Sequence, residues 1–156
     1  MAAPHDYHAA AMPTHVGHDF GTSSPIRIDQ DRIDQFAHCT GDDQWIHVDV
    51  PRAEAEGPFG TTIAHGFLVL SLIPVVQYEL GVYPKDARSM LNYGIDKVRF
   101  LAPVPAGSSL AMRVQLSAVE AKGAGRFLVR CTNTAFNVDA PEKPVMVADS
   151  LAMVMA

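Results

Sequence analysis

The sequence predicts an α+β domain in which an antiparallel sheet wraps around one long, central, apolar helix. Two observations predict this arrangement. Residues 64–80 are almost wholly apolar, on more than one face of a helix, which is typical of a helix buried in the middle of a small fold. Further along, apolar and polar residues alternate over 110–118 and again over 127–131, which is the period of strands with one face toward water.

The amino-terminal segment has no clear pattern. Residues 1–22 are rich in Ala, His, Pro and Gly and show neither helical nor strand periodicity, so we expect a loose arm, followed by a single domain over 23–156. The arm carries four histidines, but no carboxylate or thiolate cluster accompanies them, and we expect no metal site there. These histidines are His5, His8, His15 and His18.

Capping residues mark the helices that precede the apolar run. After a short alternating strand over 25–28, Asp29 offers an N-cap for a helix that should end near Gly41. A second, short helix is expected over 51–57, with proline at its start and glycine at its end. The segment between these helices begins where the backbone can turn sharply.

The rest of the sheet follows from turn signals. The sequence Lys-Gly-Ala-Gly at 122–125 predicts a hairpin turn between the two alternating strands. A further strand is expected over 91–100, broken near Gly94, and another over 145–155. Neither repeats nor a linker interrupt this order, so one domain accounts for it.

Charge and composition exclude several classes of partner. The chain has 12 basic and 17 acidic residues among 156, which leaves no basic field for nucleic acid and no cationic cluster for a membrane. No apolar stretch of about 18 residues predicts a membrane span, and the first 20 residues do not resemble a signal peptide. Cys39 and Cys131 are far apart, so we expect buried thiols in a reducing, cytoplasmic compartment.

A carboxylate and an imidazole five positions apart are the strongest chemical signal. Asp42 and His47 follow the first predicted helix, and Gly66 stands at the head of the apolar run. A carboxylate, an imidazole and a free helix-start N–H suit acid–base chemistry on a polarised carbonyl compound. Taken alone the pair has a plainer interpretation, in which Asp42 forms a turn after Gly41 and His47 is a hydrogen-bonded core histidine.

Longer stretches strengthen the functional interpretation. The sequence TGDDQWIHVD at 40–49, TTIAHG at 61–66, NYG at 92–94, VRF at 98–100 and Pro103 resemble the MaoC-like (R)-specific enoyl-CoA hydratases. The resemblance covers about residues 20–156 in order. It implies a hotdog fold, a homodimer, an acyl-CoA thioester as substrate and no metal or organic cofactor.

The same resemblance implies the site residues. The catalytic pair of the family falls on Asp42 and His47, and a hydroxyl that the family places five residues beyond the glycine falls on Ser71. The better-known version of the motif has asparagine and proline where this chain has Gln44 and Trp45. This departure bears on substrate shape rather than on reaction type.

Hydration of a trans-2-enoyl thioester needs a base, an acid and a donor to the enolate oxygen. A neutral His47 suits the base, because an ordinary imidazole can accept a proton near pH 7. Asp42 would hold the same water and pass a proton to carbon, although the two groups can also work as a coupled pair. We assign the oxyanion donor to the backbone N–H of Gly66.

The neighbours of the motif have competing interpretations. We expect Asp43 to be solvated, whereas Asp49 either orients His47 or is simply exposed. His65 is expected to be structural and to hold the turn that presents Gly66. Trp45 either lines the substrate pocket or packs in the core.

Four residues of the strand over 91–100 are candidates for substrate contacts. Asn92 and Tyr93 are candidates for the lining of the acyl channel. Lys97 and Arg99 could meet the phosphates of coenzyme A, but two basic residues on a strand are also typical of a solvated face.

Two rival functions are also compatible with the sequence. A hotdog acyl-CoA thioesterase would usually carry its key carboxylate on the central helix, and no Asp or Glu occurs between Gly66 and Val76. A noncatalytic acyl-thioester-binding or partner subunit would not need both Asp42 and His47. The acyl chain length and the choice between coenzyme A and an acyl carrier protein depend on packing and stay open.

Overall fold

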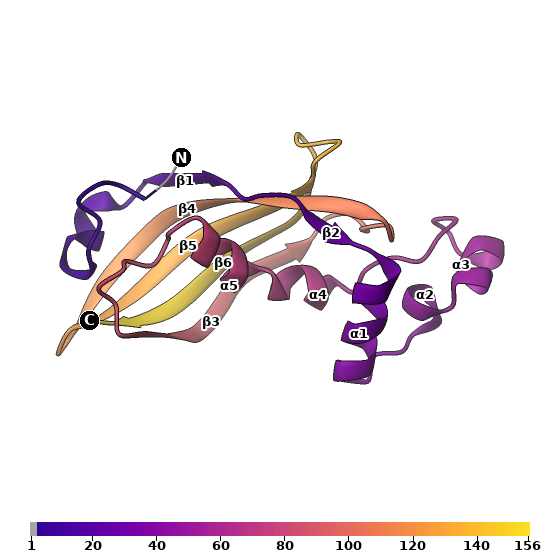
Figure 1. Cartoon of the computed structure of the whole chain (residues 1–156), viewed down its shortest axis with the longest axis horizontal. Coiled ribbons are helices and arrows are strands. Elements are labelled where there is room, and N and C mark those ends of the chain that lie inside the picture. The colour runs from indigo at the N-terminus through magenta and orange to yellow at the C-terminus, as the bar shows by residue number, and fades with distance from the viewer. Residues whose placement is uncertain (1–2) are drawn as a thin grey trace.

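A curved antiparallel sheet forms the body of the protein (Figure 1). The structure is a computed structural model and describes residues 3–156. The strand order is β1-β4-β5-β6-β3, and β2 also pairs with β4. The strands are β1 (Asp19–Thr22), β2 (Ile26–Ile28), β3 (Ser89–Phe100), β4 (Ser108–Gly123), β5 (Arg126–Asn137) and β6 (Pro144–Met155).

The helices fall into two groups. In Figure 1, α1, α2 and α3 lie together beyond one end of the sheet, whereas α5 lies across the sheet. No helix within residues 3–156 is long and apolar enough to cross a membrane. The helices are the 3-10 helix η1 (Ala9–His15), α1 (Gln30–Thr40), α2 (Trp45–Val48), α3 (Val50–Glu56), α4 (Gly66–Ser71) and α5 (Ile73–Glu79).

The apolar run forms two successive helices rather than one helix over 64–80. Helix α4 ends at Ser71 and α5 begins at Ile73, with Leu72 between them. Pro74 lies in the first turn of α5 and explains the break, because proline has no N–H to donate and its ring crowds the carbonyl of residue 70. Buried side chains of both helices still join the strands in one core; they include Leu68, Val69, Ile73 and Val76.

The prediction of a loose arm over residues 1–22 is wrong for its described part. Residues 9–15 form η1 and residues 19–22 form β1, and the side chains of Met12 and Phe20 are fully buried in the core. The Tyr7 hydroxyl also donates to the Val82 carbonyl at 2.7 Å. Isolated apolar residues without a period can still pack when the tertiary structure offers them a surface. Residues 1–2 of the predicted arm lie outside the described residues.

The predicted boundaries of the first helix are confirmed. The Asp29 carboxylate accepts a hydrogen bond from the Arg32 N–H at 3.0 Å, so Asp29 is the N-cap of α1. At the other end Gly41 adopts φ 80° and its N–H donates to the Ala37 carbonyl at 2.8 Å. Only glycine takes this left-handed conformation at little cost, and the chain turns here directly before Asp42.

The sheet also follows the sequence pattern. The β4–β5 hairpin turns at Gly123, Ala124 and Gly125, all with positive φ. Strand β3 pairs with β6 through two register shifts, one of them between Asn92 and Gly94, where the sequence predicts a break. Strand β3 forms one edge of the sheet.

One cysteine differs from its prediction. Cys131 on β5 is buried, and burial raises the pKa of its thiol to about 12. Cys39 is exposed. It lies two residues after the buried Ala37 on α1, which is about 200° around a helix of 3.6 residues per turn and therefore on the solvent face.

Candidate active site

His47 is a buried histidine whose tautomer is fixed by the backbone. It belongs to α2 and its residue is 7% exposed. Its Nδ1 lies 2.7 Å from the carbonyl oxygen of Ile63. Because a carbonyl only accepts, Nδ1 carries the proton and donates it, and Nε2 of the neutral ring holds the free lone pair.

The backbone of His47 is fixed as well. Its carbonyl accepts a hydrogen bond from Nε2 of Gln30 on α1 at 2.8 Å. The side-chain oxygen of Gln30 accepts from the buried Thr62 hydroxyl at 2.5 Å. Gln30 thus joins α1 to α2 and to the segment that leads into α4.

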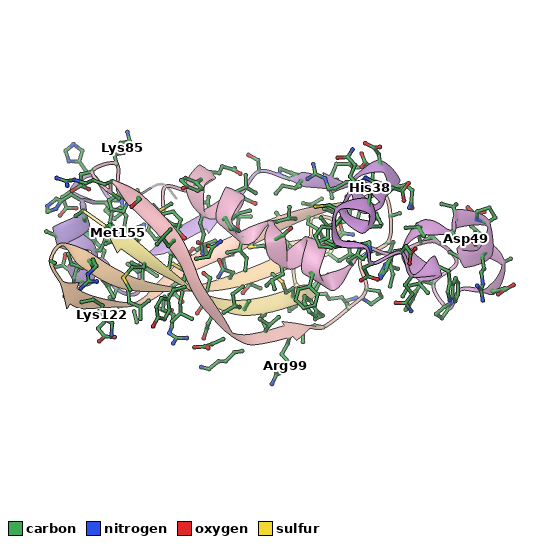
Figure 2. The ribbon with its side chains drawn as sticks, turned by 90° about the horizontal axis from the view of Figure 1, so that it is seen from below. His38, Asp49, Lys85, Arg99, Lys122 and Met155 are labelled. Atoms are coloured by element: carbon green, nitrogen blue, oxygen red, sulfur yellow. The ribbon has the colours of Figure 1, made fainter. Side chains whose placement is uncertain are left out.

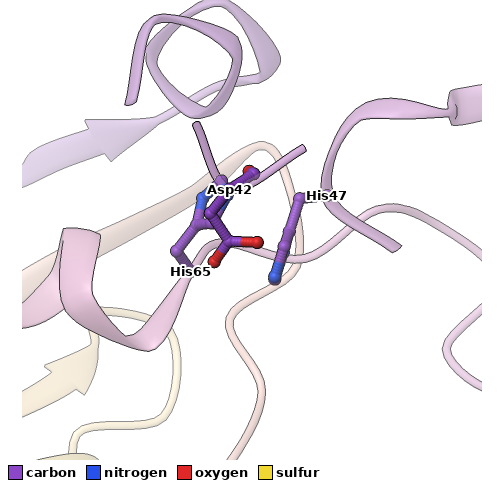
Figure 3. Close-up of side chains that lie close together, drawn as sticks. All are labelled: Asp42, His47 and His65. Atoms are coloured by element: carbon purple, nitrogen blue, oxygen red, sulfur yellow. The ribbon is translucent and has the colours of Figure 1, made fainter. Parts of the chain in front are cut away.

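Asp42 reaches His47 from the turn after α1. The carboxylate is exposed, and it lies close to the imidazoles of His47 and His65, with one potential ligand atom from each residue within 4.8 Å of the others. Figure 3 shows the Asp42 carboxylate beside the His47 ring. The structure therefore brings together the carboxylate and the imidazole that the sequence pairs.

His65 completes this cluster. It is the residue directly before α4, and its Nε2 lies 2.9 Å from the Asp42 carbonyl oxygen. Its ring stacks on the His47 ring, with centroids 3.8 Å apart and planes inclined by 28°. The sequence marked His65 only as part of a turn, and nothing in its spacing from Asp42 signals this contact.

The surroundings of His47 favour its neutral form. Burial is the largest cause that lowers the pKa of His47 below its ordinary 6.5, and the charge of a protonated His65 lowers it further. The hydrogen bond to Ile63 and the Asp42 carboxylate act in the opposite direction but do not cancel these effects. A neutral ring with a free Nε2 is the form that a general base requires.

A cavity of about 320 Å³ opens beside His47. Gly66, the first residue of α4, lines it and has no acceptor for its N–H one turn earlier in the helix. A Cβ on Gly66 would lie 3.1 Å from three ring atoms of Phe100, which lines the same cavity. The other lining residues are all apolar: Ile63, Ala64, Val69, Leu101, Ala102, Pro103, Val104 and Val145.

The geometry of the cluster does not favour a metal ion. Among the described residues, Asp42, His47 and His65 form the one group of three possible ligands. Imidazole lone pairs lie in their ring planes, and two stacked planes inclined by 28° cannot both aim at one ion at about 2 Å. We therefore assign no metal to this site.

Ser71 and Asn92 lie in a second hollow, away from His47. This groove of about 560 Å³ is mostly apolar and runs between α4, α5 and β3, and Tyr93 also lines it. The Ser71 hydroxyl donates to the Leu68 carbonyl at 2.7 Å, one turn back in its own helix. The structure does not bring Ser71 or Asn92 to the His47 cavity. Ser71 is five residues beyond Gly66 in α4, about 140° around the helix and about 7.5 Å along it, and Asn92 lies on the edge strand β3.

The remaining candidates lie on the surface. Asp43 is exposed, and Asp49 is an exposed N-cap that accepts from the Arg52 N–H at 3.1 Å, so Asp49 does not orient His47. Trp45 is half-buried, and the Arg52 guanidinium lies over its ring, 4.4 Å from the ring centroid. Trp45 does not line the His47 cavity. Figure 2 shows Asp49 at the end of the molecule opposite Lys85 and Lys122.

The two basic residues of β3 are exposed. Lys97 Nζ lies 3.6 Å from the Asp149 carboxylate, and Arg99 donates to the carbonyl of Val98. Arg99 projects away from β3 (Figure 2), one residue before the cavity-lining Phe100. Of Lys97 and Arg99, Arg99 is therefore closer in sequence to the residues that line the His47 cavity.

The fold is the hotdog fold of the MaoC-like family. The model of the MaoC-like domain family matches residues 11–137, and the chain belongs to this family of hydratases and dehydratases. Among curated proteins, it is 43% identical over 148 residues to the 3-hydroxyacyl-thioester dehydratase Z of Mycobacterium tuberculosis, which covers 94% of this chain and 95% of that protein. The predicted fold class and family are thereby confirmed.

Two further relatives show how broad the family is. The nodulation protein N of Rhizobium meliloti is 38% identical over 149 residues, which is 96% of this chain and 92% of that protein. The unliganded (R)-hydratase PhaJ1 of Pseudomonas aeruginosa superposes with a TM-score of 0.70 at 26% identity, over 90% of this chain and 81% of that one. This chain thus shares its fold with an (R)-hydratase and its sequence with proteins of more than one printed function.

Proposed function

We propose that this protein catalyses the reversible addition of water to trans-2-enoyl-CoA, which gives (R)-3-hydroxyacyl-CoA. The observation that carries the proposal is the arrangement of His47. Its Nδ1–H is held by the Ile63 carbonyl, so the Nε2 lone pair is free beside the Asp42 carboxylate. The names of a thioester dehydratase and an (R)-hydratase among the relatives support the same chemistry.

The proposed reaction balances without a cofactor. Nε2 of His47 removes a proton from a water that Asp42 also holds, and the water oxygen forms a bond to C3 of the enoyl thioester. The electron pair of the C2–C3 double bond moves toward C1, and negative charge develops on the thioester oxygen. A proton then returns to C2 from the Asp42–His47 pair, and both groups regain their starting forms.

Gly66 is the proposed donor to the thioester oxygen. Its N–H stands at the start of α4 on the wall of the His47 cavity, and the absence of a side chain allows close approach. A preorganised backbone donor of this kind stabilises developing charge by about 3–4 kcal/mol.

The exposed apolar surface supports a homodimer. Phe67 of α4 is 68% exposed and Tyr93 of β3 is 65% exposed, and both line the groove between these elements. An unpaired edge strand with apolar side chains invites pairing with another chain. We propose that a second copy of the chain covers this surface, which also includes Val75, Tyr78, Leu91 and Ile95.

The rival functions fit the structure less well. A thioesterase would need a carboxylate from the α4–α5 region near the cavity, but Glu79, at the end of α5, accepts a hydrogen bond from the Ser24 N–H at 2.6 Å. A noncatalytic subunit would not need the fixed tautomer of His47 beside Asp42. We therefore favour the hydratase.

The decisive assay uses crotonyl-CoA with the purified chain. We expect loss of the conjugated enoyl absorbance without release of free thiol, which separates hydration from thioester hydrolysis. Asp42→Asn and His47→Gln should each lower kcat by about 10²–10⁴-fold. Asp43→Asn, an exposed neighbour, is the matched control and should keep the parent rate. Release of thiol, or full activity in both site variants, would contradict the proposal.

A further inference from the structure

His65 is a buried ring in contact with two other rings. Its residue is 2% exposed, although it directly precedes a helix at the edge of a cavity. One side of the ring stacks on His47, with centroids 3.8 Å apart, and the Phe36 ring lies 5.0 Å away. A side chain held in this way has little freedom to change rotamer.

The same ring fixes Asp42 through the backbone. Because the Asp42 carbonyl can only accept, Nε2 of His65 must carry the proton of this 2.9 Å hydrogen bond. Asp42 and His65 are 23 residues apart, so the bond joins the turn after α1 to the start of α4. Nδ1 of His65 is buried and has no hydrogen-bond partner among the described residues, so the bond to Asp42 is the one hydrogen bond that this ring makes there.

The turn before α4 does not need the His65 side chain. The N–H of Ile63 donates to the Ile46 carbonyl at 3.0 Å, and the N–H of Ala64 donates to the Val104 carbonyl at 2.8 Å. These backbone bonds already hold the segment that presents Gly66. The side chain of His65 instead contacts Asp42 and His47, the proposed catalytic pair.

We propose that His65 is a positioning residue that orients Asp42 through its carbonyl and His47 through its ring face. The proposal rests on the hydratase function proposed above. His65 touches the catalytic pair but does not line the cavity of His47, so it acts through these two residues and not on substrate. Removal of its contacts should therefore change kcat and leave KM near the parent value.

Two substitutions separate the contacts of His65. His65→Phe keeps a flat ring against His47 but removes the donor to Asp42, whereas His65→Gln keeps a donor near the former Nε2 and removes the ring. We expect kcat for crotonyl-CoA to fall by about 10- to 100-fold in His65→Phe, since small displacements of reacting groups have effects of this size. His65→Gln should recover part of this loss.

A pH profile distinguishes positioning from general destabilisation. Because the charge of His65 helps to lower the pKa of His47, the acid limb of kcat/KM should move to higher pH in His65→Phe. An NMR titration of the His47 ring should show the same shift. His15→Gln, at another largely buried histidine that packs on Tyr7 5.5 Å away, is the control and should move neither readout.

The outcomes separate this proposal from the proposed function. Parent-like rates in both His65 variants would overturn the positioning role, as would activity that falls only in proportion to the folded fraction with the His47 titration unmoved. A parent protein that does not hydrate enoyl-CoA overturns the hydratase function instead. The NMR titration would then still decide whether His65 controls His47.

Discussion

Replacement of Gly66 by alanine tests the site through a single methyl group. The new Cβ would lie 3.1 Å from three ring atoms of Phe100, a few tenths of an ångström inside an ordinary contact. Alanine gains up to about 1 kcal/mol of helix propensity over glycine, and a tight contact of this kind costs about 1–3 kcal/mol. The net change in the free energy of unfolding should therefore be small, and the variant should fold.

Activity should respond much more strongly than stability. The methyl group would stand on the cavity wall next to the N–H that we assign to the thioester oxygen, and it would keep that oxygen at a distance. Loss of one oxyanion donor costs about 3–4 kcal/mol, so we expect kcat for crotonyl-CoA to fall by about 10²–10³-fold. Thermal denaturation would run in parallel to show that the fold persists.

A double variant separates blocked approach from displacement of Phe100. Phe100→Leu removes the ring that the new methyl group would touch. If blocked approach is the cause, Gly66→Ala should lower kcat by the same factor in the Phe100→Leu background as in the parent. Full activity of Gly66→Ala, or its recovery in the double variant, would refute the assignment of Gly66 as the donor.

Three other measurements test separate parts of the structure. Since burial and His65 lower the pKa of His47 and the base must be neutral, kcat/KM should fall on acidification only below pH 6.5, and a pH–rate profile with its acid limb above 6.5 would contradict this. Tyr93→Asp should convert the proposed dimer to a monomer in sedimentation analysis, because it places a charge on the exposed surface of β3; an unchanged mass argues against that interface. A thiol reagent should modify Cys39 rapidly and reach Cys131 only after unfolding, and two fast thiols in the native protein would be inconsistent with the buried β5 site.

Features that depend on near neighbours in the chain were predictable. Alternation over 110–118 and 127–131 places β4 and β5 correctly, because side chains of a strand point to opposite faces in turn. Asp29 and Gly41 define the ends of α1, because capping is a contact across one turn. These signals are local, so a single sequence contains them.

Features that depend on packing were not predictable in the same way. Met12 and Phe20 have no periodic partners in the sequence, yet they fill the core because the sheet offers them an apolar surface. Ser71 follows Gly66 at the spacing that the family resemblance implies, but the helix directs its hydroxyl to the Leu68 carbonyl. Pro74 is plain in the sequence, but the apolar pattern around it predicts one continuous helix where the chain forms two.

By itself, the sequence determined the ends of α1, the strands β4 and β5, the sharp turn before Asp42, and the residue types that could carry acid–base chemistry. Tertiary structure alone decided that His65 joins Asp42 to His47, and that the Ile63 carbonyl selects which nitrogen of His47 is free. The physical reason is the distance along the chain over which each kind of interaction acts. Periodicity and capping act over a few residues, whereas a proton position and a ring stack depend on groups that only the folded chain brings together.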